Sequence, residues 1–368
     1  MKFKLILMTI FLIQGLTMAK EIGVYIGTYT RKSPADGIYY AKLDLDSGKL
    51  KDLKLAARTP NPSFLVIHPN GKYLYAVGEM KDGFIRSFSI DPKTGKLKKI
   101  NQQSSGGKGP CHLSMDKEGK YLFAANYSSG SAAVFPVNQD GSLKPASSIV
   151  QHNGCSVTKR QKGPHAHSIN LSNDGRFIYV ADLGMDKIMT YKFDSNTGCL
   201  SSATPSYTTT KPGAGPRHLA FLNDKVFVIN ELDSTISTFK RNPGNGALIP
   251  VASVSTLPEG FEGKSTCAEI AVGPRGKYLY GSNRGHDSIV VFRINPDGTL
   301  KCSGYLDKGI DVPRHFNIDP SGNFCVVGNQ KSGSVKVFKI NVKTGIPGPE
   351  ISSVEVGKPI CIKLYDVD

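Results

Sequence analysis

The sequence predicts an all-β protein, a seven-bladed β-propeller with four antiparallel strands in each blade. The first observation is a repeat of about fifty residues, because a fixed period of this size is typical of propellers and solenoids. The second is that each repeat contains short alternating runs of aromatic and β-branched residues between glycine-containing turns, which indicates strands rather than helices. The third is that the two ends of the chain each supply part of one further repeat.

Six copies of the repeat contain a recognisable pair of strands joined by a tight turn. They read NPSFLVIHPNGKYLYAVGE from Asn61, GPCHLSMDKEGKYLFAANY from Gly109, GPHAHSINLSNDGRFIYVADL from Gly163, GPRHLAFLNDKVFVINEL from Gly215, TCAEIAVGPRGKYLYGSNRGH from Thr266 and VPRHFNIDPSGNFCVVGNQ from Val312. A third strand follows each pair, as in residues 234–241 and 287–294, and a weaker fourth strand completes the unit. Since one such sheet cannot bury both of its faces alone, the sheets are expected to stack around a ring.

The two chain ends are expected to share the seventh blade. Residues 21–30 and 37–45 supply only a second and a third strand, whereas residues 357–366 look like a lone innermost strand. Pairing them would close the ring and remove the exposed edges that an open stack of sheets would leave.

The first nineteen residues differ from the rest of the chain. Lys2 and Lys4 precede an apolar run from Leu5 to Leu16, and small residues stand before Lys20, which is typical of a cleaved signal peptide. The run is short for a membrane-spanning helix, which needs about 20 residues. We therefore expect a signal peptide at residues 1–19, a single propeller domain at residues 20–368, and a periplasmic or secreted protein without a membrane span.

The overall charge indicates an anionic ligand. The chain has a formal net charge of +16, but it lacks a helix-turn-helix pattern, zinc-ligand spacing or an arginine-rich block, so nucleic acid is not an expected partner. The seven cysteines are scattered and odd in number, which argues against a disulfide framework. We expect a monomer that binds a small anion.

Polar side chains concentrate at one rim of the predicted channel. In each blade the start of the first strand and the end of the second lie at the same rim, because the two strands are antiparallel. Six of the eight histidines fall at these points. The rim candidates include His112, His165, His167, Arg217, His218, Glu231, Arg284, His286, Arg314 and His315, with Asn230 and Asn283 at strand ends.

These residue types suit ester chemistry on an anion. Histidine transfers protons near neutral pH, arginine binds carboxylate or phosphate, and a glutamate among cations can orient them. The alternative is that the rim residues only cap the blades and the propeller is a binding or scaffold module. GxSxG, HExxH, Walker and dinucleotide motifs are absent from the sequence. Rim carboxylates are interspersed with cations, so no metal ion and no other cofactor is expected.

The insertion at residues 152–164 lies between a fourth strand and the next first strand, which puts it on the same face as the rim. It contains Lys159, Arg160 and Lys162. It either guides anions toward the channel or is merely a solvated loop, and the sequence leaves both readings open.

The motifs PHAHS, GPRHLAF, NEL, AEI, SNRGH and PRHFNIDPSG, in successive blades, make the chain resemble the lactonase family of seven-bladed propellers. That family includes bacterial propeller-type 6-phosphogluconolactonase and fungal 3-carboxy-cis,cis-muconate lactonising enzyme, and the resemblance covers nearly the whole chain after the leader. It implies a metal-independent site formed here by His167, Arg217, Glu231 and Arg284.

The resemblance also suggests roles for these residues. His167 would be the general acid/base, with His165 as a competitor, and Glu231 would be its partner or a second proton-transfer group. Arg217 and Arg284 would hold the substrate anion and the developing oxyanion. The surrounding shell of substrate-binding residues would comprise His112, His165, His218, Asn230, Asn283, His286, Arg314 and His315.

The resemblance implies hydrolysis of a sugar-acid lactone such as 6-phosphogluconolactone, with a carboxymuconate-type lactonising activity as the alternative. The expected export does not fit a substrate that is made in the cytosol. The substrate is therefore open between a phosphorylated sugar lactone, another sugar lactone and a cyclic carboxylate.

Overall fold

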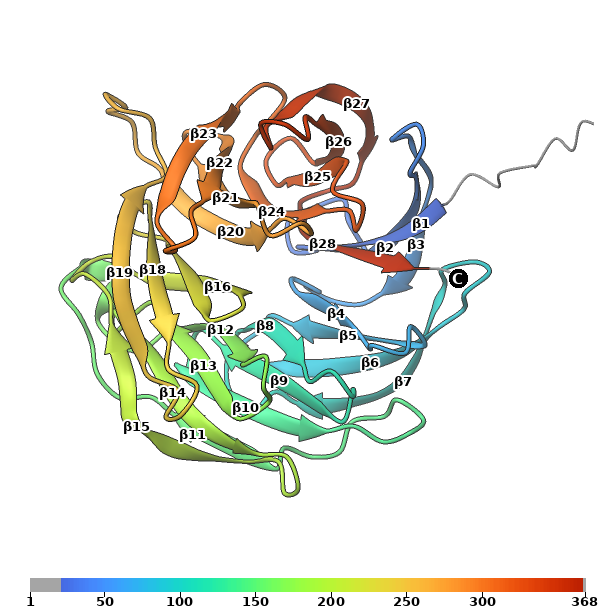
Figure 1. Cartoon of the computed structure of the whole chain (residues 1–368). Helices are drawn as coiled ribbons and strands as arrows, with labels where there is room; N and C mark the ends of the chain where they lie inside the picture. Colours follow the sequence, from blue (N-terminus) through green and yellow to red (C-terminus); the bar gives the residue numbers. More distant parts are fainter. Residues whose placement is uncertain (1–20, 367–368) are drawn as a thin grey trace, which may run out of the picture.

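The computed structural model describes residues 21–366, which form seven four-stranded antiparallel sheets arranged as the blades of a propeller (Figure 1). The predicted fold class is therefore confirmed. The expected signal peptide, residues 1–19, lies outside the described residues.

The strands of each sheet, from the innermost to the outermost, are as follows. Blade 1 contains β28 (Pro359–Asp366), β1 (Glu21–Thr28), β2 (Gly37–Asp44) and β3 (Leu50–Arg58), and blade 2 contains β4 (Leu65–Ile67), β5 (Tyr73–Gly78), β6 (Phe84–Ile90) and β7 (Leu97–Ser104). Blade 3 contains β8 (Pro110–Met115), β9 (Tyr121–Asn126), β10 (Ser131–Pro136) and β11 (Ser148–Gln151), and blade 4 contains β12 (Ala166–Leu171), β13 (Phe177–Asp182), β14 (Lys187–Asp194) and β15 (Cys199–Thr209). Blade 5 contains β16 (Pro216–Leu222), β17 (Lys225–Asn230), β18 (Thr235–Arg241) and β19 (Leu248–Ser255). Blade 6 contains β20 (Thr266–Val272), β21 (Tyr278–Arg284), β22 (Ser288–Ile294) and β23 (Leu300–Leu306), and blade 7 contains β24 (Pro313–Ile318), β25 (Phe324–Asn329), β26 (Ser334–Ile340) and β27 (Pro347–Glu355).

The shared blade closes the ring as the sequence predicted. The C-terminal strand β28 pairs antiparallel with the N-terminal strand β1, with Tyr25 opposite Lys363 (Figure 1). The innermost strand of each blade also contacts the innermost strands of its neighbours all around the channel. The pairing covers the inner edge of β1 and joins the two chain ends, which stabilises the ring against opening.

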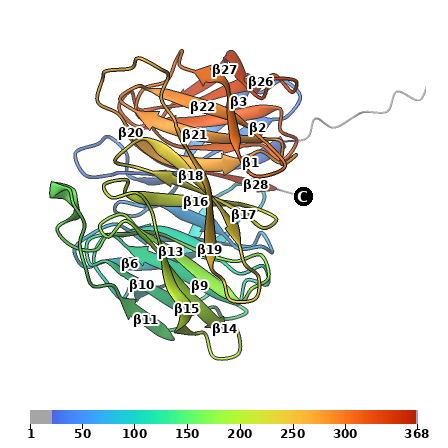
Figure 2. The same ribbon diagram turned by 60° about the vertical axis from the view of Figure 1, so that its left-hand side comes forward.

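The core lies between the blades, whose sheets pack face to face (Figure 2). A recurrent contact locks neighbouring blades together: a buried tyrosine on a second strand donates its hydroxyl hydrogen to a glycine carbonyl in a turn of the next blade. The four instances are Tyr25 to Gly95 (3.1 Å), Tyr75 to Gly141 (3.1 Å), Tyr179 to Gly246 (2.8 Å) and Tyr280 to Gly345 (3.0 Å). Glycine is required at Gly95 because its φ is +67° and a Cβ would lie 2.5 Å from the Tyr40 ring. The glycine in each turn is thus part of the repeat for a packing reason.

An irregularity of pairing positions the site. In six blades the ladder between the innermost strand and the second strand shifts at the channel rim, which is the signature of a β-bulge. A bulge leaves one residue outside the ladder and re-aims its side chain. The extra residues include Cys111, His167, Arg217 and Arg314.

The insertion contains the short 3-10 helix η1 (Lys159–Gln161) and runs from β11 to β12. No helix within residues 21–366 is long and apolar enough to cross a membrane.

Candidate active site

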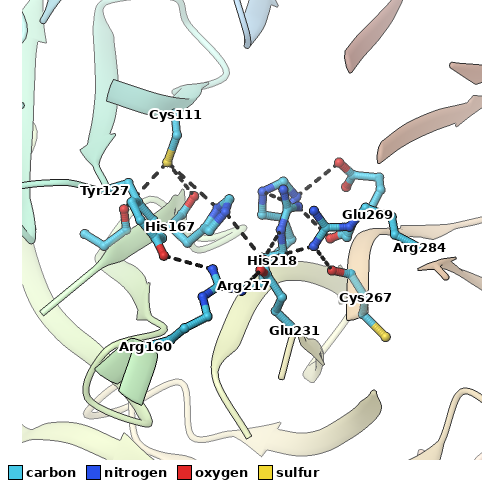
Figure 3. A network of polar contacts seen from close by, with 12 residues as sticks. Cys111, Tyr127, Arg160, His167, Arg217, His218, Glu231, Cys267, Glu269 and Arg284 are labelled. Carbon is cyan, nitrogen blue, oxygen red and sulfur yellow. Dashed lines mark hydrogen bonds and ion pairs between the residues drawn. The ribbon is translucent and has the colours of Figure 1, made fainter. Parts of the chain in front are cut away.

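The site is assembled from the bulges of first strands and the ends of second strands. Arg217 and His167 occupy the bulges of β16 and β12, whereas Glu231 directly follows β17 and Arg284 ends β21. Three neighbouring blades thus bring the four residues that the sequence singled out into direct contact (Figure 3).

Glu231 is the centre of this cluster. Its Oε2 atom lies 3.0 Å from Arg217 Nε and 3.2 Å from Arg284 Nη2, and its Oε1 atom lies 2.8 Å from Arg160 Nη1. The carboxylate is buried, as is Arg217, whose Nη1 also donates to the Ala268 carbonyl at 2.7 Å. A single carboxylate therefore faces three guanidinium groups.

These cations set the protonation state of the carboxylate. Burial alone would raise the pKa of Glu231, but Arg284, Arg217 and Arg160 outweigh burial and lower it from 4.5 to about 2. Burial also lowers the pKa of Arg284 to about 10, still well above neutrality. At pH 7 the cluster holds one anion and three cations, and it therefore attracts a further negative charge.

His167 faces this carboxylate without a direct hydrogen bond. Its Nε2 atom lies 3.9 Å from Glu231 Oε2, and its Nδ1 atom lies 3.8 Å from the Cys111 sulfur (Figure 3). Burial, together with the nearby Arg217 and His218, lowers the pKa of His167 well below its usual range. The imidazole is consequently neutral at pH 7 and one of its nitrogens can accept a proton.

Further imidazoles line the channel beside His167. The His218 ring lies 5.2 Å from the His167 ring and 5.0 Å from the His112 ring. Glu269 connects His218 Nδ1, at 3.1 Å, with His315 Nε2, at 3.2 Å. Burial lowers the pKa values of all these histidines, that of His315 to about 3. They form a neutral polar layer, here called the histidine layer and defined as His112, His167, His218 and His315.

A second ionic group lies on the opposite side of the channel. The Tyr29 hydroxyl donates to Glu79, whose carboxylate oxygens are 3.0 and 3.1 Å away, and the Arg314 guanidinium lies 5.5 Å from the centre of the Tyr29 ring. A small cavity lies between this group and the side chains of His167 and Arg217. Its lining includes Glu79, Cys111, His167, Arg217, His218, Arg314 and His315.

Four residues predicted for the substrate-binding shell lie outside the cluster. Asn283 donates to the Thr256 carbonyl at 2.9 Å, thereby holding the chain that enters from the preceding blade, and Asn230 donates to the hydroxyl groups of its own blade. His286 contacts Phe261 and Tyr305 toward the blade periphery.

The fourth, His165, stands before β12 at the mouth and stacks on the Tyr127 ring, with the ring centres 4.4 Å apart. The structure thus separates the two histidines between which the sequence could not decide. His167 lines the cavity, whereas His165 is outside its lining and packs on Tyr127.

Arg160 is the residue of the Glu231 cluster that the sequence did not assign to the site. It comes from η1 in the insertion, and its Nη2 atom donates to the Tyr127 hydroxyl at 3.0 Å. The available signal was the basic insertion on the rim face, but sequence alone could not decide whether its cations point inward.

Among residues 21–366, no group of three or more histidine, cysteine, aspartate or glutamate side chains is arranged to hold a metal ion. The prediction of metal-independent chemistry remains to be tested in solution.

Comparison with known proteins identifies the family. The model of the lactonase family, described as a seven-bladed β-propeller, matches residues 23–364. The chain belongs to this lactonase family. It is similar to the 6-phosphogluconolactonase of Bacillus subtilis, with 35% identity over 350 residues that cover 94% of this chain and 99% of the relative. The 6-phosphogluconolactonase of Formosa agariphila is 37% identical over 334 residues, covering 88% and 93% of the two chains.

Among solved structures, the periplasmic gluconolactonase of Pseudomonas aeruginosa superposes with a TM-score of 0.89 at 33% identity, covering 95% of this chain and all of that one. The resemblance inferred from the sequence motifs is thereby confirmed, and the chain is a lactonase-type enzyme by its family.

Proposed function

We propose that this lactonase-family protein hydrolyses a sugar-acid lactone in the cavity beside Glu231. The observation that carries the proposal is the convergence of His167, Arg217 and Arg284 on one buried carboxylate. A scaffold module would not need a neutral histidine, an ionised carboxylate and several arginines around one cavity, because burying such groups costs stability. The proposal therefore favours catalysis over a purely structural use of the propeller.

The proton chemistry is assigned to His167. Its neutral imidazole accepts a proton from water, and the resulting hydroxide attacks the lactone carbonyl carbon. When the tetrahedral intermediate collapses, the ring C–O bond breaks and the imidazolium returns its proton to the departing alkoxide oxygen. The product is an open-chain hydroxy acid.

Glu231 is assigned an electrostatic role. With its pKa near 2 it is a poor proton acceptor at pH 7. Its charge holds Arg217 and Arg284 in place and stabilises the imidazolium that forms on His167. Of the two roles that the sequence left open for Glu231, the proposal keeps that of a partner to His167 and sets aside that of a second proton-transfer group.

Binding of the developing oxyanion is assigned to Arg284. Its Nε atom is buried and has no hydrogen-bond acceptor within the described residues, whereas its Nη2 atom is engaged with Glu231 and the Cys267 carbonyl. A buried donor without a partner is costly. Binding of the developing oxyanion would remove that cost in the transition state.

The proposal also includes export. The apolar segment before Lys20 has the pattern of a signal peptide, and the similar protein from Pseudomonas aeruginosa is named as periplasmic. Cell fractionation tests export: the full chain is expected outside the cytoplasm and a variant lacking residues 2–19 inside it. Equal cytoplasmic recovery of both forms would refute export.

The activity is tested by pH-stat hydrolysis of 6-phosphogluconolactone, glucono-δ-lactone and a muconolactone, with spontaneous opening subtracted. His167→Ala is expected to lower kcat by about 10²- to 10⁴-fold, the usual contribution of a general base. The matched control is His68→Ala, which removes a histidine that bonds the Gly119 carbonyl far from the cavity.

Rates equal to the blank on every lactone would refute the proposal. Equal losses in the two histidine variants would instead refute the role of His167. A chelator arm tests metal independence, because turnover that survives chelation needs no exchangeable metal ion.

A further inference from the structure

The insertion between β11 and β12 is a fixed element rather than a solvated loop. At its start, His152 and Asp182 form a fully buried pair with Nδ1 and Oδ2 2.6 Å apart. The Ser156 hydroxyl donates to Asp186 at 2.5 Å, and the buried Gln161 amide donates to the Leu183 carbonyl at 2.8 Å. The backbone on each side of Arg160 is therefore tied to blade 4, so the position of this arginine is set before any ligand arrives.

Arg160 differs from the other cations of the cluster in exposure. Its side chain is 49% exposed, compared with 3% for Arg217 and 13% for Arg284. It lies between Glu231 and the Tyr127 hydroxyl (Figure 3). Solvent, and therefore a dissolved anion, reaches this guanidinium more readily than it reaches Arg217 or Arg284.

The contact between Arg160 and Glu231 is also the one most easily exchanged. Arg160 binds Oε1, whereas Arg217 and Arg284 both bind Oε2. If Arg160 transferred to a ligand anion, the carboxylate would keep Arg217 and Arg284 as partners, both of which are less exposed. A planar guanidinium binds a phosphate or carboxylate through two parallel hydrogen bonds, so such an exchange has a suitable geometry.

We infer that Arg160 is a specificity-determining residue that binds the anionic group of a charged sugar lactone at the channel mouth. The inference rests on the proposed lactonase function and adds to it the residue that would recognise a phosphate or carboxylate remote from the reacting carbonyl. In such a molecule the carbonyl can lie beside His167 while the charged end reaches outward. Arg160 then selects charged over neutral lactones without touching the reacting atoms.

The test compares 6-phosphogluconolactone with glucono-δ-lactone, which differ only in the phosphate. The quantity measured is the ratio of kcat/KM for the charged lactone to that for the neutral one. Arg160→Ala is expected to lower this ratio by about 10- to 100-fold, as expected for loss of a hydrogen-bonded charge pair, mainly through KM for the charged lactone. Arg160→Lys keeps the charge but loses the paired N–H donors of the guanidinium, so its ratio is expected to lie between those of wild type and Arg160→Ala.

The matched control is Lys159→Ala, which removes one positive charge from the adjacent exposed position of the same helix. Its ratio is expected to stay within about twofold of wild type, because solvent screens an exposed charge. An unchanged ratio in Arg160→Ala, or an equal fall in Lys159→Ala, would overturn the inference.

A binding arm separates this inference from the proposed function. If wild type hydrolysed neither lactone, the proposed function would fail, and calorimetric titration with 6-phosphogluconate would judge Arg160 alone. Binding weakened at least about tenfold in Arg160→Ala, but not in Lys159→Ala, would support an anion site at Arg160. Equal binding in the three proteins would overturn it.

Discussion

The charge balance around Glu231 leads to a quantitative prediction for Glu231→Gln. The substitution keeps the shape of the side chain but leaves Arg160, Arg217 and Arg284 without their shared anion. The pKa of Glu231 falls from 4.5 to about 2, and each unit corresponds to about 1.4 kcal/mol of interaction with the ionised form. Glu231→Gln is therefore expected to reduce the free energy of unfolding by about 3 kcal/mol at pH 7.

Differential scanning calorimetry at pH 7 is the assay. For a chain of this length, about 3 kcal/mol corresponds to a fall in Tm of about 4 °C. The matched control is Glu259→Gln, which neutralises an exposed glutamate and is expected to leave Tm within about 1 °C.

The pH dependence has a definite sign. Since the pKa of Glu231 is depressed in the folded state, its stabilisation is complete above pH 4.5 and is lost as the pH falls through about 2. The difference in stability between wild type and Glu231→Gln should therefore narrow below pH 4.5.

Inorganic phosphate provides an independent check. It is expected to raise the Tm of Glu231→Gln more than that of wild type, because a bound anion replaces the missing carboxylate. An equal or higher Tm for Glu231→Gln at pH 7 without phosphate would refute the reasoning, since it would mean that Glu231 does not stabilise the arginines.

Three further predictions address the histidine layer, the insertion and the closure of the ring. The pKa of His315 is lowered to about 3 and the pKa values of the other three histidines also fall, so below pH 6.5 the unfolded state binds protons that the native state does not. Unfolding scans should therefore show a loss of stability as the pH drops from about 6.5, by up to about 1.4 kcal/mol per pH unit per histidine. A flat stability profile between pH 7 and 4 would contradict this prediction. Gly184→Ala would put a Cβ 1.9 Å from the Gly163 carbonyl oxygen and 2.9 Å from the His165 nitrogen, so kcat/KM on a lactone is expected to fall at least about tenfold. The control variant Gly163→Ala, whose Cβ meets no atom within 4 Å, should retain activity. Similar rates in both variants would argue against a role for this packing. Deletion of residues 359–368 removes β28 and exposes the inner edge of β1, so soluble expression and circular dichroism are expected to report aggregation or loss of cooperative unfolding, and a cooperative, soluble truncated protein would show that closure is dispensable.

The sequence was sufficient to predict the architecture because the physical causes of the fold are local and repeated. Alternating residues and a tight turn define each hairpin. A glycine recurs in the turn before the outermost strand, as at Gly95, because a Cβ there would collide with an aromatic ring. The shared blade was also predictable, since residues 21–45 and 357–366 each lack the strands that the other supplies. The hairpin signals each lie within one stretch of chain, and the shared blade follows from comparing the two ends with the complete repeats.

The candidate site was only partly predictable. Sequence placed Arg217, Glu231 and Arg284 at one rim, and the structure brings them together there. The sequence could not decide whether His165 or His167 faces the channel, because a regular strand directs residues two apart to the same side. The bulge at the start of β12 removes that equivalence, with His167 in the cavity and His165 stacked on Tyr127.

The two asparagines and Arg160 also show that sequence alone does not determine where a rim side chain points. The ends of second strands do reach the rim, but Asn283 turns into the blade and bonds the incoming chain. The residues that follow each asparagine, Glu231 and Arg284, point the other way and meet each other, because successive residues of a strand point to opposite sides. Arg160 is 71 residues from Glu231 in the chain, and only the anchoring of the insertion brings them together. The sequence by itself determined the blades and the rim, whose causes are local; the tertiary structure decided which rim side chains meet, because bulges and long-range contacts set their directions.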